Sequence, residues 1–328
     1  MIVSKTPMRA SLFGGGSDFR EYFETSRIGY GSVLSTTLDM YVYIIVNKKF
    51  DDAIRVVYKG NELVNSVDEI KHNIIREALK LTGVDHGIEI IYLADIPMSN
   101  AGVGLASSSA LAVGVLNALH AYKNETVSAE QLAREACHIE IEVLGQRIGI
   151  QDQFAVATGG FNRYRFMKDG NVVVSPVCMD KKTAREFRRN FMLFFTGNTR
   201  DSSKILAEQS ATIETKRFML DDLVQTVNNV YEDLSCGNLD RIGLELDRTW
   251  HIKKKFAGGV SNEKIDVMYM TAINSGALGG KILGAGGGGF MLLYVPEQKQ
   301  TAVREALSAY REIPFKIGKN GSKIVYKD

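Results

Sequence analysis

The sequence predicts an α+β protein with two domains, and three observations support this prediction. The chain has 328 residues, about the length of two ordinary domains. Runs of β-branched and aromatic residues dominate its first half, whereas apolar residues at helical spacing dominate its second half. Strands and helices do not alternate regularly, which argues against a parallel sheet built from βαβ units. We place the boundary in a charged stretch near residue 180, giving domains 1–180 and 181–328.

The first sixty residues predict strands, and a helix and a further strand follow them. Residues 38–47 and 52–58 are rich in β-branched and aromatic side chains, and the charged residues between them are typical of a hairpin turn. A helix is predicted over 67–81, where apolar residues recur at helical spacing before Gly83. Residues 88–93 predict a further strand.

Two helices are predicted between residues 107 and 144, and the pattern becomes more helical after residue 177. One is predicted over Ser107–Tyr122 and another over 128–144, where Ser128 and Gln131 have the spacing of a capping box. Residues 172–177 predict a strand. The remaining predictions are helices over 201–234, 238–254, 262–275 and 297–310, and strands over 290–295 and 314–317.

The composition excludes several classes of protein. Lys and Arg number 40 against 38 Asp and Glu, a balance that argues against a general nucleic-acid binder. The three cysteines are an odd number without C-x-x-C spacing, which disfavours a disulfide framework and a structural zinc site. The longest apolar runs are far shorter than the roughly 20 residues of a membrane span, and no signal peptide is evident. We therefore expect a cytoplasmic protein without a nucleic-acid or membrane partner.

The first unusual segment, residues 7–18, reads PMRASLFGGGSD. Arg9 interrupts an otherwise apolar strand that ends in three glycines and an aspartate. An arginine in such a strand is seldom unpaired, so we expect it to meet a carboxylate or a phosphate. An ordinary strand that leads into a glycine turn remains an equal alternative.

The second unusual segment, residues 97–111, reads PMSNAGVGLASSSAL and leads into an apolar helix. A helix N-terminus carries free N–H groups and a positive dipole end, so it can bind an anion. Glycines allow phosphate oxygens to come close, and serine hydroxyls can ligate Mg²⁺. Three consecutive serines exceed what a helix cap needs, which favours phosphate binding over a serine-rich cap.

The third unusual segment, residues 281–289, reads KILGAGGGG and ends a stretch, Gly258 to Gly289, that contains 10 of the 31 glycines. Gly284, Gly286 and Gly289 match a dinucleotide fingerprint, but a helix pattern precedes them and a strand pattern follows. We therefore reject a Rossmann site and expect a loop that packs against another glycine loop and a ligand. The nearby lysines 253–255 are interpreted as a solvated surface.

Two carboxylates are candidates for chemistry. Glu140 borders the apolar face of the predicted helix 128–144, and Asp152 follows a glycine turn in the run GIQDQF. Such carboxylates can act as a base or hold a metal ion. A turn-capping role for Asp152 remains an alternative.

Together these segments resemble the GHMP kinases, the family of galactokinase, homoserine kinase and mevalonate kinase. Its three motifs occur in order, as P-x-R-x-x-L-x-G, P-x-x-x-x-G-x-G-L-A-S-S-S-A and K-I-x-G-A-G-G-G-G, and the likeness spans residues 5 to about 295. The resemblance implies an N-terminal domain like ribosomal protein S5, a ferredoxin-like C-terminal domain, and an active site between them.

The resemblance also implies roles for individual residues. Asp152 would orient or deprotonate the acceptor hydroxyl, with Arg9 beside it, and Ser108 and Glu140 would hold Mg²⁺. Residues 284–287 would close over the site. The phosphates of ATP would lie on the segment formed by Gly102, Gly104, Leu105, Ala106, Ser107, Ser108 and Ser109.

A departure from galactokinases indicates the substrate. Galactokinases carry a glutamate and a histidine where this chain has Gly15 and Gly16, so the sugar pocket is expected to be wider and free of a carboxylate that would repel a phosphate. Residues 9–18, 33–39 and 195–203 resemble the D-glycero-D-manno-heptose 7-phosphate kinases. The residues expected to bind the substrate are Gly15, Gly16, Ser17, Asp18, Arg200, Gly286 and Gly287.

The sequence thus predicts an ATP- and Mg²⁺-dependent kinase for the anomeric hydroxyl of this heptose phosphate, a step toward a nucleotide-activated heptose. Arg200 is the main candidate for the second phosphate, whereas Arg163 and Lys204 are expected to be surface charges. A galactokinase- or fucokinase-like enzyme for an unphosphorylated sugar is the alternative, and a non-catalytic sensor of the same fold is a weaker one. A monomer or a homodimer is expected.

Overall fold

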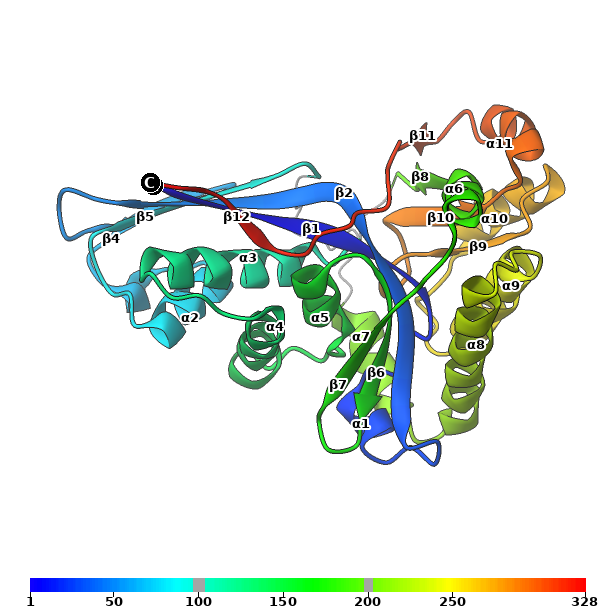
Figure 1. Ribbon diagram of the computed structural model, residues 1–328, viewed down its shortest axis with the longest axis horizontal. Helices are drawn as coiled ribbons and strands as arrows, with labels where there is room; N and C mark the ends of the chain where they lie inside the picture. Colours follow the sequence, from blue (N-terminus) through cyan, green and yellow to red (C-terminus); the bar gives the residue numbers. More distant parts are fainter. Residues whose placement is uncertain (97–103, 198–202) are drawn as a thin grey trace.

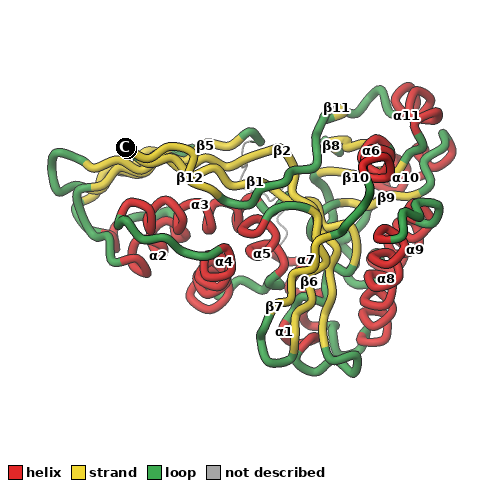
Figure 2. Tube along the Cα trace, in the orientation of Figure 1, coloured by secondary structure: helices red, strands yellow, loops and turns green. Residues whose placement is uncertain are grey.

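A computed structural model describes residues 1–96, 104–197 and 203–328. Two sheets organise it, and both are visible in yellow in Figure 2. The eight-stranded first sheet has the order β12-β1-β2-β5-β3-β4, with β6 and β7 joined through β2. The four-stranded second sheet has the order β11-β8-β10-β9. The chain is thus a mixed α+β protein, as the sequence predicts.

The strands of the first sheet are β1 (Ile2–Phe13), β2 (Tyr30–Lys48), β3 (Ile54–Val57), β4 (Asn61–Val64), β5 (Ile88–Ala94), β6 (Phe161–Met167), β7 (Val172–Pro176) and β12 (Lys323–Lys327). The second sheet contains β8 (Phe191–Phe195), β9 (Gly279–Ile282), β10 (Phe290–Tyr294) and β11 (Arg311–Glu312). The helices are α1 (Arg20–Phe23), α2 (Asn73–Thr82), α3 (Ser107–Tyr122), α4 (Ala129–Cys137), α5 (Gln151–Thr158), α6 (Lys181–Arg189), α7 (Ser203–Ala211), α8 (Arg217–Ser235), α9 (Ile242–Lys253), α10 (Glu263–Asn274) and α11 (Gln300–Ala306).

The long strand β2 extends through both parts of the first sheet. Its C-terminal half pairs with β5, its N-terminal half pairs with β6, and β1 lies along much of its other edge. Figure 1 shows β2 bending between these two parts, with α2, α3 and α4 on one side of the sheet. The bend brings the end of β1 toward the second sheet, where the site lies.

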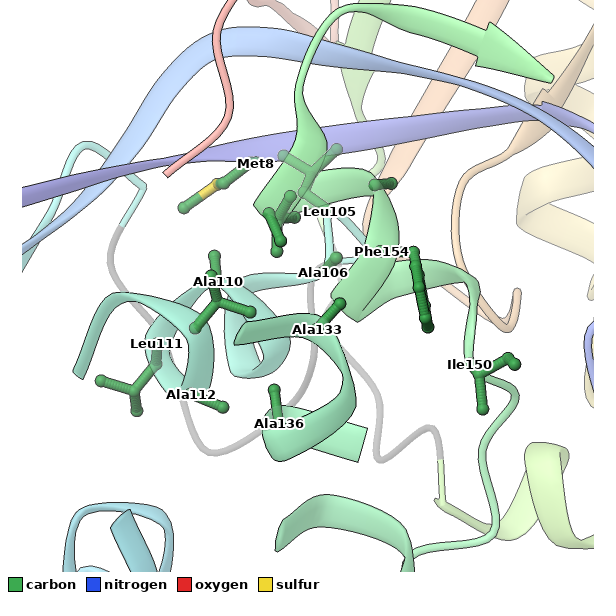
Figure 3. Packing of buried hydrophobic residues seen from close by; sticks show 14 of the residues in the cluster. Met8, Leu105, Ala106, Ala110, Leu111, Ala112, Ala133, Ala136, Ile150 and Phe154 are labelled. Carbon is green, nitrogen blue, oxygen red and sulfur yellow. The ribbon is translucent and has the colours of Figure 1, made fainter. Parts of the chain in front are cut away.

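Helix α3 is the packing centre of the first sheet. Most of its residues are buried, which explains why its sequence is apolar on all sides. A Cβ atom at Gly114 would lie 2.9 Å from Oγ1 of Thr6, so glycine lets the helix approach β1 closely. Figure 3 shows Ala110 of α3 near Met8 of β1, and Ala133 of α4 and Phe154 of α5 belong to the same buried cluster. This packing fixes the N-terminus of α3 next to β1.

The structure confirms helix Ser107–Tyr122 and corrects other predictions. The helix predicted over 201–234 ends at Ala211 and restarts at Arg217. The strand predicted over 314–317 is wrong, because only one bridge, from Ile317 to Leu38, forms there. A strand, β9, precedes the third glycine segment instead of a helix, so Gly284–Gly289 connects the antiparallel strands β9 and β10. The Rossmann interpretation stays rejected, because no helix follows these glycines.

The C-terminal tail crosses back to the first sheet. Strand β12 pairs with β1 from Ile2 to Lys5, beside the N-terminus of the chain. The domain boundary near residue 180 stays a prediction. Strand β12 lies after that boundary in the sequence but belongs to the first sheet. Within the three described ranges, no helix has the length and apolar character needed to cross a membrane.

Candidate active site

A cavity of about 340 Å³ lies where the two sheets meet. Residues from four segments line most of it: 9–19, 104–109, 140–152 and 281–288. All three unusual sequence segments and both candidate carboxylates therefore contribute to one cavity. Helices α7 and α9 complete it with Leu206, Gln209 and Lys253.

The N-terminus of α3 opens into this cavity. Ser107, Ser108 and Ser109 line it, and Ala106 before them has a left-handed backbone with φ of 58°. This conformation is unusual for alanine and turns the chain sharply into the helix. The free N–H groups of the first turn of α3 are thus available to an anion.

The two glycine loops contact each other through their backbones. A Cβ atom at Gly104 would lie 2.3 Å from the carbonyl oxygen of Leu283, and one at Gly284 would lie 2.5 Å from Cα of Gly104. Both glycines have positive φ values, 81° and 70°. Only glycine permits this approach, so the contact between residues 104 and 284 holds the β9–β10 loop against the start of α3.

We expect the substitution Gly104→Ala to destabilise the protein by at least about 2 kcal/mol, because the methyl group must displace backbone. Gly83→Ala is a matched control, since Gly83 is also left-handed, at φ of 67°, but has open space around its Cβ position. The control should lose only about 1 kcal/mol. Thermal melting measures both, and equal losses would show that the loop contact is not tight.

Glu140 is fully buried in a π-helical turn, His138–Val143, that follows α4. The sequence predicts one continuous α-helix here, whereas the wider turn is typical of functional sites. The carboxylate accepts hydrogen bonds from Oγ of Ser108 at 2.5 Å, Oγ of Ser109 at 2.8 Å and Nε2 of Gln153 at 2.6 Å. Burial raises the pKa of Glu140, and these hydrogen bonds oppose the shift.

The donors around Glu140 fit Mg²⁺. Glu140 and Ser108 line the cavity, and each carries an oxygen atom that can ligate a metal ion. Mg²⁺ is commonly held by one or two protein oxygens together with substrate phosphates. In the described ranges there is no group of three or more His, Cys, Asp or Glu that could hold a metal alone. An ion here would therefore depend on phosphate oxygens for its remaining ligands.

Arg9 and Asp152 form a bidentate ion pair. Nε of Arg9 donates to Oδ1 of Asp152 at 2.7 Å, and Nη2 donates to Oδ2 at 2.6 Å. Nη1 donates to the carbonyl oxygen of Gly104 at 2.7 Å. An irregularity in the β1–β2 pairing between Pro7 and Arg9 accompanies this placement. Arg9 is 3% exposed, whereas the side chain of Asp152 is 25% exposed and accessible to a ligand.

The turn after β1 supplies the other end of the cavity. Asp18 is buried and accepts hydrogen bonds from the backbone N–H groups of Gly16 at 2.9 Å and Gln151 at 3.3 Å. Burial raises the pKa of Asp18, and the charge of Asp152 raises it further. Among the described residues, the atoms within 4 Å of a Cβ atom at Gly15 would be Nε2 of Gln151 and Oγ of Ser11, both at 3.7 Å. The space above Gly15 is therefore open.

The predicted residues are not all brought to the cavity. Ser17 is buried below the turn, where its hydroxyl donates to the carbonyl oxygens of Gly14 and Ser32. Gly286 lines the cavity, whereas Gly287 lies on an adjacent hollow of the second sheet. Gly102 and Arg200 lie outside the described residues.

The structure also shows site residues that sequence reasoning missed. Lys253 was expected in a solvated surface, but it lines the cavity together with Lys281. Ser11 and Gln151 also line the cavity. Oγ of Ser11 and Oε1 of Gln151 are buried without a hydrogen-bond partner in the described ranges. A run of three lysines does not indicate which side chain points into the protein. Ser11 and Gln151 lie in the same motifs as Arg9 and Asp152, and the sequence pattern singles out only the charged residues.

These features define a class of protein. A helix N-terminus open to an anion, a buried carboxylate with serine hydroxyls, and an arginine–aspartate pair in one cavity are the parts of an enzyme that transfers a phosphoryl group. A model of the GHMP kinase N-terminal domain matches residues 68–160, and a model of the C-terminal domain matches 226–312. The chain belongs to the GHMP kinases and is a sugar kinase of that family, whose phosphate donor is ATP.

Individual relatives agree with this family. The chain is 29% identical over 320 residues to D-glycero-α-D-manno-heptose 7-phosphate kinase from Campylobacter jejuni, and the aligned region covers 93% of each sequence. A solved D-glycero-D-manno-heptose 1-phosphate kinase from Bacteroides thetaiotaomicron has a TM-score of 0.82 at 24% identity over the whole of both chains. Lactococcus lactis galactokinase, solved with galactose, has a TM-score of 0.76 at 19% identity, and the match covers 98% of this chain and 94% of the galactokinase chain. These two structures show the same fold.

Proposed function

We propose that the protein transfers the γ-phosphoryl group of ATP to the anomeric hydroxyl of D-glycero-D-manno-heptose 7-phosphate. The observation that carries this proposal is the open, polar space above Gly15, in the same cavity as the Arg9–Asp152 pair. Ser11 and Gln151 lie next to that space, Asp18 lines the same cavity, and all three carry groups that can bind hydroxyls. The similarity to the heptose 7-phosphate kinase of Campylobacter jejuni supports the same substrate.

The transfer would use the chain's residues in fixed positions. The first turn of α3 would bind the phosphates of ATP, because its N–H groups open into the cavity. The sugar hydroxyl would attack the γ-phosphorus while the bond to the ADP oxygen breaks. Asp152 would orient that hydroxyl and accept its proton, and Arg9, which pairs with Asp152, would face the charge on the transferring group. Positioning and electrostatics supply most of the catalysis in such a reaction.

Ser108 and Glu140 would hold Mg²⁺, which would neutralise charge on the phosphates. The two serine hydroxyls and Gln153 hold the carboxylate of Glu140 in place from three sides, so its orientation is set before any ligand binds. Asp18 would accept hydrogen bonds from ring hydroxyls, and Arg200 would bind the distal phosphate. The cytoplasm as its location and a monomeric or homodimeric state stay predictions.

An assay of ADP release tests the proposal. The purified enzyme is given ATP and Mg²⁺ with heptose 7-phosphate, galactose, fucose or mevalonate. We expect turnover with the heptose phosphate at a kcat/KM at least about tenfold above that for galactose and fucose, a preference that one or two contacts can supply. Turnover of galactose or fucose without turnover of the heptose phosphate would support the alternative, a 1-kinase for an unphosphorylated sugar.

Filling the space above Gly15 should change substrate choice. The side chain of Gly15→Glu would occupy the open space and place a carboxylate there, so we expect kcat/KM for the heptose phosphate to fall at least 100-fold (about 3 kcal/mol). Gly15→Ala is the matched control, because its methyl group would meet Ser11 and Gln151 at ordinary contact distance. The alanine variant should stay within about threefold of the wild type. A glutamate variant with unchanged kinetics would place the sugar elsewhere.

A further inference from the structure

Two lysines, Lys253 and Lys281, line the cavity together with Arg9 and the carboxylates of Asp18, Glu140 and Asp152. Asp152 pairs with Arg9, whereas neither Lys253 nor Lys281 forms an ion pair with a carboxylate in the described ranges. The nearby Asp18 is buried, which disfavours its charged form. Buried cations in proteins are usually paired with an anion or bind one. The unpaired lysines therefore indicate that an anionic group belongs in this cavity.

Lys253 lies at the contact between the two glycine loops. Its Nζ donates hydrogen bonds to the carbonyl oxygens of Ile282 and Gly284 in the β9–β10 segment. Gly284 packs on Gly104, whose carbonyl oxygen accepts the hydrogen bond from Arg9. Backbone contacts thus connect the ammonium of Lys253 to the Arg9–Asp152 pair. Two of its three N–H donors are used, so one is left for a further acceptor.

The position of Lys253 distinguishes it from Lys281. Lys281 donates to the carbonyl oxygen of Leu12 and is buried beneath β1. Lys253 extends from the end of α9 and also borders a small hollow beside Gly15, Gly16 and Phe19. Lys253 therefore lies between the Gly284 loop and the space above Gly15.

We propose that Lys253 is a further catalytic residue, whose ammonium group donates its remaining N–H to an oxygen of the phosphoryl group in transfer. This inference rests on the proposed function. The charge of Lys253 would stabilise the phosphoryl oxygens opposite the N-terminus of α3, and its bonds to the β9–β10 loop would hold it in place. A role limited to holding that loop is the structural alternative.

The charge of Lys253 predicts a pH dependence. Burial and the charge of Arg9 lower the pKa of Lys253 to about 7, although Asp152 and Asp18 oppose this shift. Burial, and then the charges of Lys253 and Arg9, lower the pKa of the neighbouring Lys281 as well. If the ammonium form is the active one, kcat/KM should fall as pH rises through the pKa of the free enzyme. An arginine at this position stays charged throughout.

Three variants test the inference. Lys253→Gln keeps donors for the loop carbonyls but loses the charge, Lys253→Arg keeps the charge, and Lys255→Met is a control on the exposed neighbour. We expect a fall in kcat of at least 100-fold for the glutamine variant, with KM for ATP changed less than about fivefold. The fall of kcat/KM above pH 7 should disappear in the arginine variant, and the control should match the wild type.

Two outcomes would overturn the inference: a glutamine variant with kcat within threefold of the wild type, or an arginine variant that keeps the wild-type pH profile. The slow hydrolysis of ATP without sugar is measured in parallel, because transfer to water uses the same phosphoryl position. A wild type that phosphorylates no sugar of the panel would overturn the proposed function alone. The rate of ATP hydrolysis by Lys253→Gln would then decide the role of Lys253. A rate equal to that of the wild type would contradict the inference, and a lower rate would support it.

Discussion

Replacing Asp152 by asparagine is expected to lower kcat by about 10³-fold, because the amide can neither accept a proton from the sugar hydroxyl nor keep a charge beside Arg9. KM for ATP should change little, since Asp152 lies beyond the first turn of α3 that would bind the phosphates. The partly exposed side chain of Asp152 is the acidic partner of an otherwise buried arginine, so its position is fixed by both bonds of the pair. Steady-state kinetics at saturating ATP measures the effect.

A matched control separates this effect from the loss of an ion pair in general. Asp222 pairs with Arg248 at 2.7 Å on the surface of α8 and α9, away from the residues that line the cavity. Asp222→Asn should leave kcat within about twofold of the wild type and change stability by less than about 1 kcal/mol. If Asp152→Asn also kept kcat within threefold, Asp152 would have no role in orienting or deprotonating the hydroxyl.

Replacing Glu140 by glutamine should lower activity while it stabilises the ligand-free protein. We expect a loss of about 10²-fold in kcat at fixed Mg²⁺ and a weaker apparent affinity for Mg²⁺, because an amide oxygen replaces a charged ligand. Burial raises the pKa of Glu140 in the folded protein above its ordinary value of 4.5. The unfolded chain therefore loses this proton at lower pH than the folded chain does, and stability falls as pH rises between the two pKa values.

Melting curves without Mg²⁺ test this pair of effects. At neutral pH, Glu140→Gln should melt at a higher temperature than the wild type, and the difference should shrink as pH falls toward 4.5. Glu142→Gln is the control, since Glu142 is exposed and bonded to Arg20 and His138, which lower its pKa. Its substitution should not raise the melting temperature. A lower melting temperature for Glu140→Gln, with activity retained, would contradict the assignment of Glu140 to a metal site.

Local signals explain how much of the fold could be predicted. Helix Ser107–Tyr122 was predicted with its full bounds, because a serine run opens an uninterrupted apolar segment. Ser128 caps α4 as its spacing predicts, accepting a hydrogen bond from the backbone N–H of Gln131. In contrast, β12 is a short, mostly exposed strand that exists because β1 offers it an edge. Pairing between the two ends of a chain has no local pattern.

The candidate site divides in the same way. Arg9, Glu140 and Asp152 could be predicted because a charged residue in an apolar or glycine-rich setting is conspicuous in the sequence. The inward direction of Lys253 could not, because it depends on the end of α9 meeting a loop about 30 residues further along the chain. The packing of the Gly284 loop on another glycine loop was predicted from the sequence, and the contact between Gly284 and Gly104 confirms it. Motif spacing does not predict which backbone atoms of the two loops meet.

Phosphorus NMR of the reaction product tests the central claim most directly. The wild-type enzyme is mixed with ATP, Mg²⁺ and D-glycero-D-manno-heptose 7-phosphate, and phosphorus resonances are followed as ADP forms. The proposed function predicts a new phosphate resonance coupled to the anomeric proton while the resonance of the 7-phosphate persists. ADP formation without that coupling, or an anomeric phosphate formed on galactose but not on the heptose phosphate, would contradict it.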